Sequence, residues 1–486
     1  MAHRLSDEAS KAIDERLRVI ERMRRRNALR TAYYEGEQRL SAISPTIPPP
    51  LQDLAIAVGW PKKAVNVRAA RIRPEGFRLP TSSELLDEIE EALEHAGFEE
   101  KDALARLTAL QYGCAFMFSS LDDNGDLRLV VRSPLDATAG MDHRSGELFS
   151  GIELIEPGHI MVFGPEWNFE AQRSGGFWNV LEEHEATGRV TCTVYTEDAS
   201  IRRPFGQSVI TRPVMGLTDI AVRTILRQEV SAEFYSSPQR YLLGADTSMF
   251  EDEEGNIRPA WETVLGSLLV APDHIDEETL ERVTPTVGQF AQMSMLPHSD
   301  QLRSIAMMFA GETSIPPSRL GIIHDNPSSA EAILAEEADL ITSAEQSYPA
   351  FARARKSVVL DVAALLTGRP DVGPVEFRRL STRWRNAATP NMQSQAQSVT
   401  MLVQAGILPP NSSVTWELMG FDDSTIRRLE DDQRRSGALS MMSALRGAAA
   451  EARADPTVAA VADQRAPGAG SPVAPGAEVM AGGVTR

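Results

Sequence analysis

The densest group of side chains able to ligate a metal surrounds His184. Three glutamates, Glu182, Glu183 and Glu185, flank this histidine within a strand-like segment. Histidine and carboxylate groups can bind zinc, but a metal site needs more ligands at a defined spacing. The other histidines are scattered along the sequence. The favoured interpretation is therefore a solvated end of a β-hairpin, with no metal.

A second acidic cluster, Asp122-Asp123-Asn124-Gly125-Asp126, has the composition of a calcium-binding loop. An EF-hand loop that begins at Asp122 would require a glutamate where Ser133 stands. Because strand-like segments flank the cluster, we interpret it as the turn of a β-hairpin.

The sequence contains none of the short motifs that mark common catalytic sites. It has no Gly-x-x-x-x-Gly-Lys-[Ser/Thr] loop, which excludes a motor ATPase of the P-loop kind. It also lacks Gly-x-Gly-x-x-Gly, His-Glu-x-x-His and Gly-x-Ser-x-Gly. We therefore expect a protein that is not an enzyme and that needs no cofactor. A hydrolase that uses scattered carboxylates stays open as an alternative.

The composition indicates a large, acidic globular protein. The chain has 486 residues, of which 42% are hydrophobic, enough for two or three packed units. Its net charge of −19 comes from 68 acidic and 49 basic side chains. Affinity for duplex DNA depends on Lys and Arg that neutralise phosphates. If this chain handles DNA, it should therefore guide the duplex without gripping it.

The two cysteines, Cys114 and Cys192, each lie in a strand-like apolar segment. Buried, inert thiols are the common state for such residues, and we expect neither a disulfide framework nor a zinc site. The N-terminal segment is charged and has no apolar core of a signal peptide. No window approaches the ~20 apolar residues that span a bilayer. These features favour assembly in a cytoplasm, away from membranes.

The first half of the chain alternates helical and strand-like segments. A helical pattern from Leu5 reaches a plausible stop at Gly36, and Thr81 and Glu84 have the spacing of a capping box for a helix over 83–95. A further helix is predicted over 99–111. Strands are predicted over 114–119, 127–131, 147–155, 159–163, 176–184 and 189–196. The pattern is typical of an α+β unit with antiparallel hairpins.

The second half begins with a helical pattern from Leu217 to about Tyr241. An acidic, loop-rich insert follows to about Pro297. Its most acidic part is a patch formed by Glu251, Asp252, Glu253 and Glu254. Such a patch is usually just a solvated turn. Ser299 can then cap a helix with one apolar face, which is expected to stop at Gly311.

Prolines interrupt the chain between that helix and the next one. The phrase 315–321 cannot be helical, because proline removes a donor and constrains its predecessor. After Asn326-Pro327, a long helix with a capping box at Ser328 continues to about Thr367. Pro349 lies near its middle and is expected to kink it.

The C-terminal part starts with a basic run, Arg378 to Arg385. Such arginines more often pair with carboxylates on a strand, although contact with DNA is the alternative. A helix from Thr389 and shorter helices between Ser413 and Arg446 follow. The remainder is rich in Ala, Pro and Gly without periodicity, which indicates a disordered tail.

Several phrases, taken in order, resemble the portal (head–tail connector) family of long-tailed phages, especially those of actinobacteria. They extend over roughly residues 25 to 435. The most specific are Ala310 to Gly321, with its paired prolines, and Asp325 to Ile333, with its asparagine–proline pair. The others are Tyr33 to Gly36, Pro74 to Arg78 and Ala232 to Tyr241.

The resemblance implies a portal fold: mainly helical, with antiparallel β-hairpins in wing and clip, long stem helices and a long kinked helix. By position, the regions are wing over 1–210, stem helix over 211–244, clip over 245–296, stem helix over 297–311, tunnel loop over 312–328, wing over 329–388, crown over 389–449 and a disordered tail over 450–486.

The resemblance also implies a homo-oligomeric, dodecameric ring at the capsid vertex of the virion, assembled in the host cytoplasm. Double-stranded DNA would pass through it during packaging and ejection. Its partners would be the terminase large subunit, the head–tail adaptor, and the major capsid and scaffolding proteins. The tunnel-loop residues expected nearest the DNA are Arg319, His324, Asp325 and Asn326. The patch from Glu251 to Glu254, if it is clip, would meet the terminase and then the adaptor. The alternative is another virion protein, such as a head-completion adaptor or minor capsid component.

Overall fold

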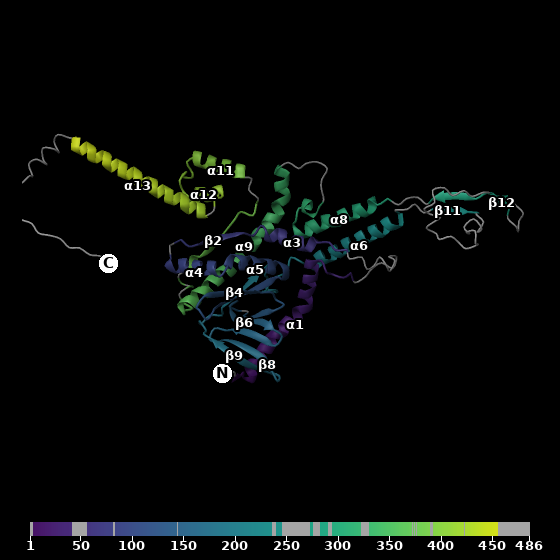
Figure 1. The fold of residues 1–486 in the computed structure, drawn as a ribbon, viewed down its shortest axis with the longest axis horizontal. Helices are drawn as coiled ribbons and strands as arrows, with labels where there is room; N and C mark the ends of the chain where they lie inside the picture. The colour runs from purple at the N-terminus through teal and green to yellow at the C-terminus, as the bar shows by residue number, and fades with distance from the viewer. Residues whose placement is uncertain are drawn as a thin grey trace, which may run out of the picture. The chain divides into compact units, whose positions relative to one another are not determined.

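The computed structural model describes residues 3–40, 56–80, 83–142, 144–235, 240–244, 273–275, 282–289, 294–321, 330–371, 373, 375, 377–388, 392–421 and 423–454. The chain divides into two compact units, 1–388 and 389–486, and each is described by itself. The first combines helices with antiparallel sheets, which confirms the predicted α+β class (Figure 1).

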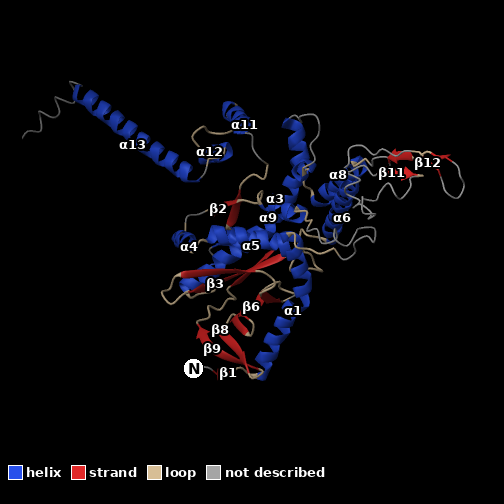
Figure 2. Cartoon of the chain, turned by 45° about the vertical axis from the view of Figure 1, so that its right-hand side comes forward, coloured by secondary structure: helices blue, strands red, loops and turns tan. Residues whose placement is uncertain are grey.

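A six-stranded antiparallel sheet forms one layer of the first unit. Its strands are, in spatial order, β1 (His3–Arg4), β9 (Phe177–His184), β8 (Asn168–Ser174), β7 (His159–Phe163), β6 (Leu148–Glu156) and β5 (Ala137–Met141). Helix α1 (Asp7–Glu35) runs along this sheet (Figure 2) and packs Ile13 into a core with Ile160 and Trp178. Its predicted end is confirmed, because Gly36 caps it with a φ of 78°.

A three-stranded antiparallel sheet, β10 (Cys192–Thr196), β3 (Cys114–Leu121) and β4 (Leu127–Arg132), forms a second layer. Its inner face joins the main core through Met117 and Tyr195. Both cysteines are free and buried on these strands, as predicted. Burial raises the pKa of the Cys114 thiol to about 12, so this group stays protonated at neutral pH.

The acidic cluster from Asp122 to Asp126 is the β3–β4 turn, as predicted. One carboxylate oxygen of Asp122 accepts hydrogen bonds from the backbone N–H groups of Asn124 (2.9 Å) and Asp126 (2.8 Å). This Asx-type turn uses the side chain to close the hairpin. In these two sheets, prediction missed the short β1, β5, which is made of small residues, and the largely polar β8.

Three helices and a small sheet also pack on the main core: α3 (Trp60–Ala69), α4 (Glu84–His95), α5 (Phe98–Tyr112), and the pair β2 (Pro74–Arg78) and β15 (Ser381–Trp384). The cap of α4 is Ser83, whose hydroxyl accepts from the N–H of Leu86 at 3.2 Å. Thr81, the residue expected to cap it, lies outside the described residues.

Helices α6 (Arg212–Tyr235) and α8 (Leu296–Thr313) pack side by side (Figure 1). Both begin earlier than predicted, because Pro213 and Pro297 are accommodated in the first turns of the helices. The expected stop at Gly311 is wrong. The helix continues to Thr313, and Ser314 ends it in the left-handed conformation (φ 55°), with its N–H bonded to the Ala310 carbonyl.

Short strands lie between these two helices in the sequence. Strand β11 (Arg240–Leu243) pairs with β14 (Thr286–Gln289), and β12 (His274–Ile275) pairs with β13 (Arg282–Val283). The acidic patch predicted at Glu251, Asp252, Glu253 and Glu254 lies outside the described residues.

The longest helix of the first unit is α9 (Ala330–Thr367), which contains Pro349 and is followed by Gly368 in the left-handed conformation. Proline has no N–H to donate to the carbonyl four residues earlier. The ribbon of α9, green in Figure 1, changes direction along its length. That Pro349 causes this kink stays a prediction. The aromatic ring of Tyr348 stacks on Trp384 of β15, with ring centroids 4.5 Å apart, and holds this part of α9 against the small sheet.

A buried ionic cluster joins α9 to α5. The fully buried guanidinium of Arg355 contacts Asp102 (2.7 Å) and Glu99 (2.7 Å) and lies against the rings of Phe77 and Phe98. The Tyr195 hydroxyl donates to the same aspartate at 2.8 Å. Burial and the neighbouring carboxylate raise the pKa of Tyr195 well above its usual value, so it stays a donor.

The second unit contains α11 (Met392–Gln404), α12 (Ser413–Met419) and α13 (Asp423–Ala454). The helix α13 is longer than the short helices predicted here, and its last turn occupies residues that we expected in the disordered tail. No described helix is both long and apolar enough to cross a bilayer.

We predict that Asp102→Asn lowers the free energy of unfolding by about 3–5 kcal/mol, because it leaves the buried Arg355 with only the partly exposed Glu99. Urea denaturation of the full chain, followed by tryptophan fluorescence, measures the loss. As a control, Asp371→Asn breaks the exposed pair with Arg369 and should leave the transition unchanged. Equal transitions for both variants would show that the buried cluster contributes no special stability.

Candidate DNA-channel site

Helices α6 and α8 form an antiparallel pair, because contacts join opposite ends of the two. At one end the Thr211 hydroxyl donates to Glu312 at 3.3 Å, and at the other Ser231 lies 3.4 Å from the Nε2 atom of His298. Their shared apolar core includes Val222 from α6. From α8, Ile305 lies in this core and Phe309 in the main core.

The chain leaves α8 through a tightly fixed segment. After Ser314, Ile315 is only 2% exposed and packs in the main core. A 3₁₀ turn, η2 (Pro317–Leu320), follows and ends at Gly321 with a φ of 88°. The described chain then resumes in α9 at Ala330. The base of the predicted tunnel loop is therefore anchored by apolar burial on the side of α8.

Arg319 of η2 anchors the same segment to α9 by charge. Its guanidinium lies 2.9 Å from the Glu337 carboxylate, which also contacts Arg71 at 2.9 Å. Burial tends to raise the pKa of Glu337, but the two guanidinium groups outweigh it and hold the pKa below its usual range. This carboxylate is therefore ionised at neutral pH and bridges the loop base to the segment that follows α3.

Of the four residues expected near the DNA, the structure describes only Arg319, which is half-exposed and paired with Glu337. His324, Asp325 and Asn326 lie outside the described residues. Sequence reasoning missed Glu337 and Arg71, because neither stands in a motif. Their partners are distant along the chain.

At one position of the basic run (residues 378–385), an arginine pairs with a carboxylate, as we expected. Arg383 lies on β15 and contacts Glu75 of the paired strand β2 at 3.3 Å. This arginine is thus part of an ion pair across a small sheet, and the pairing predicted for it is confirmed.

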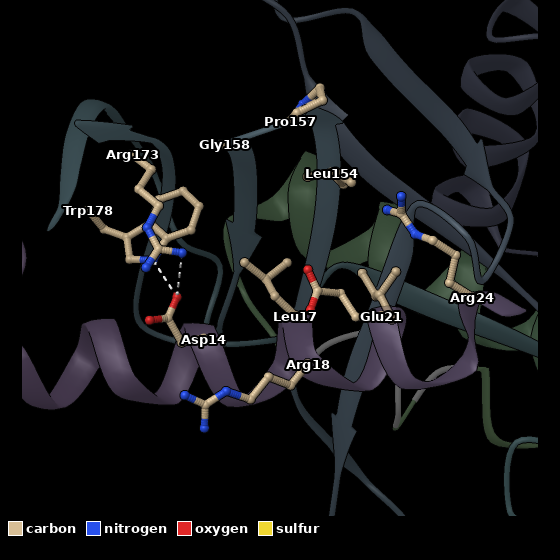
Figure 3. A pocket seen from close by; sticks show the side chains of 11 residues that line it. Asp14, Leu17, Arg18, Glu21, Arg24, Leu154, Pro157, Gly158, Arg173 and Trp178 are labelled. Atoms are coloured by element: carbon tan, nitrogen blue, oxygen red, sulfur yellow. Dashed lines mark hydrogen bonds and ion pairs between the residues drawn. The ribbon is translucent and has the colours of Figure 1, made fainter. Parts of the chain in front are cut away.

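A cleft of about 430 Å³ lies between α1 and the six-stranded sheet (Figure 3). Asp14 of α1 points into it, accepts from the indole N–H of Trp178 at 3.0 Å and lies 3.5 Å from Arg173. Arg18 and Arg24 of the same helix line its rim. Because the carboxylate is already engaged by sheet residues, its evident role is to fasten the helix to the sheet.

Comparison with known proteins decides the family. Residues 13–437 match the family described as phage portal protein, SPP1 Gp6-like. The chain belongs to this portal family. The match includes the α6–α8 pair, the loop base and α9, so these elements are parts of a portal-family protein.

Two relatives are named portal protein. The portal protein of Mycobacterium phage D29 is 26% identical over 410 residues, which cover 81% of this chain and 82% of the relative. The portal protein of Mycobacterium phage L5 is 26% identical over 466 residues, which cover 92% of this chain and 90% of the relative. Both come from phages of an actinobacterium, in agreement with the resemblance seen in the sequence.

Solved structures show looser similarity to this portal-family chain. A chain in the virion of a native gene transfer agent particle is 13% identical with a TM-score of 0.41, over 74% of this chain and 89% of that one. A chain in the neck of the native particle computed with C12 symmetry is 12% identical with a TM-score of 0.40, over the same shares of the two chains.

In this portal-family chain, Glu337→Gln should lower the free energy of unfolding by about 1–3 kcal/mol at neutral pH, since two guanidinium groups lose a charged acceptor. The folded-state pKa of Glu337 is below its ordinary value of 4.5. The stabilisation is therefore fully present above that value and is lost as pH falls through the lower folded-state pKa.

Urea titrations of both chains at a series of pH values test this. The difference in the free energy of unfolding between the wild-type chain and Glu337→Gln should be constant near neutral pH and should disappear in acid. A gap that is absent at pH 7, or that widens as the pH falls, would contradict the assigned ion pairs.

Proposed function

We propose that this chain assembles into a closed ring that conducts double-stranded DNA at the capsid vertex during genome packaging and ejection. The observation that carries the proposal is the match to the phage portal family over residues 13–437. The portal resemblance implies a dodecamer, and portal proteins are components of the virion.

The α6–α8 pair supports ring assembly. Leu296, Met307 and Met308 of α8 expose about half or more of their surface in the single chain, while the opposite face of the helix is buried. Exposed apolar side chains that gather on one element mark contact surfaces. In a closed ring, each copy would cover this face with its neighbour.

The charge distribution supports conduction without tight binding. The net charge is −19, and the arginines nearest the loop base, Arg319 and Arg71, are already engaged by Glu337. Each phosphate that a protein neutralises adds affinity that must be lost at the next step of the DNA. A channel that must let DNA slide therefore benefits from few free cations.

We assign regions on the same basis. The sheets with α1, α3, α4, α5 and α9 would be wing, α6 and α8 the stem, and the strands β11 to β14 with the insert around them the clip. Residues 312–328 would form the tunnel loop, the second unit the crown and the C-terminal residues a tail.

The partners follow from those regions. The clip, with its acidic patch from Glu251 to Glu254, would meet the terminase large subunit and later the head–tail adaptor, while the wing would meet major capsid and scaffolding proteins. We propose assembly in the host cytoplasm and no catalytic activity. The lack of catalytic motifs in the sequence supports a structural role. Nuclease and nucleotide-hydrolysis assays with magnesium should show no turnover.

We expect negative-stain electron microscopy of the purified chain to show rings with a central hole, and native mass measurement to give the subunit number. Met308→Glu should shift the population towards monomers, because it places a charge in the proposed contact between copies. Ile201→Glu, at a fully exposed loop position outside the stem, should leave the rings intact.

A chain that remains monomeric at high concentration, even with its scaffolding protein added, would contradict the conduit and favour a head-completion adaptor. In that case, truncation from Asn326 onward should leave assembly with its partners intact.

A further inference from the structure

Four potential metal ligands gather on three neighbouring strands of the six-stranded sheet. Ligand atoms of Glu170, Glu182 and His184 lie within 4.8 Å of one another. The Nε2 atom of His159 on β7 contacts the Glu170 carboxylate from the other side. From the sequence, the only potential ligands near His184 were glutamates of its own segment. The fold adds one ligand from β8 and one supporting histidine from β7.

The strand register explains how these residues meet. Side chains two positions apart share a face of a strand, so Glu182 and His184 of β9 point to the same side. Glu183, between them, contacts His3 at 3.6 Å. The strands β8 and β9 lie side by side (Figure 1), and Glu170 is the direct partner of Glu182.

An irregularity of the sheet falls at this pair. The register shifts between Glu170 and Ala171, because Ala171 pairs with Val180 while Glu170 pairs with Glu182. One additional residue, Leu181, is thus accommodated on β9. Such a β-bulge re-aims the side chains beside it. Without the shift, Leu181 would stand opposite Glu170.

The arrangement is electrostatically unfavourable without a cation. Like charges that face each other directly across two strands destabilise a sheet. Among the described residues, the ion pairs include no lysine or arginine at Glu170 or Glu182, and His159 is the one partner of Glu170. Both Glu182 and His184 are exposed, so a metal ion has free access.

We propose that this cluster binds a divalent transition metal, with Zn²⁺ as the fitting ion. Glu170, Glu182 and His184 would supply two oxygens and one nitrogen, and a water would take the fourth position. His159 would orient Glu170 by a hydrogen bond to its carboxylate, the way outer-shell groups fix metal ligands. The ion would neutralise the facing carboxylates and fasten β8 to β9 beside the bulge.

Competition between the tag-free full chain and a chromophoric zinc chelator tests the proposal. We expect the wild-type chain to take up about one Zn²⁺ with an affinity well above that of scattered surface histidines. His184→Ala and Glu182→Gln, both at exposed positions, should each weaken binding at least tenfold. His159→Ala should weaken it by about 10- to 100-fold through the loss of orientation.

His3→Ala is the matched control, because it removes an exposed histidine that contacts the neighbouring Glu183. It should leave the affinity for Zn²⁺ unchanged. Thermal unfolding without metal checks that every variant is folded, and added Zn²⁺ should raise the midpoint only where the site is intact. Absence of stoichiometric uptake by the wild-type chain would overturn the site, as would equal affinity in the His184→Ala and His3→Ala chains.

Discussion

Burying the guanidinium of Arg355 in the first unit requires carboxylates beside it, because an unpaired ion in a protein interior costs several kcal/mol. Asp102 meets this need from α5, and Tyr195 and Arg106 complete the hydrogen bonding of that aspartate. The cluster therefore fixes how α9 lies on α5 and on the three-stranded sheet. Apolar packing alone would tolerate small shifts of the helix, whereas a buried ion pair does not.

Ion pairs hold α9 at two further places along its length. Near its C-terminal end, the buried Asp361 lies 2.5 Å from Arg189 and accepts from Thr193 at 2.9 Å. Near its beginning, Glu337 binds Arg71 and Arg319. Since Arg319 belongs to the segment that leaves α8, the loop base, α9 and the sheets form one mechanically connected body. A displacement of the loop base must move α9 or break an ion pair.

Local sequence signals predicted the elements but not these connections. Prolines, glycines and the Asp122 turn marked most boundaries correctly, because they act on the backbone next to them. The helix end predicted at Gly311 was wrong, since a glycine permits a helix end without forcing one. The helix ends instead at Ser314, which adopts the left-handed conformation. Arg355 and Glu99 are separated by 256 positions, so nothing in a local pattern joins them. Likewise, one ligand of the proposed metal site, Glu170, comes from β8, a strand that the sequence did not reveal.

The distribution of arginine links this architecture to the proposed conduit. Arginines of η2, α9, the segment after α3 and the loop before β10 are neutralised by carboxylates of the same chain, so they stabilise the fold and offer little positive charge to an external polyanion. The chain as a whole is acidic, with a net charge of −19. In the proposed conduit, arginines engaged in this way would leave the phosphates of the DNA unbound.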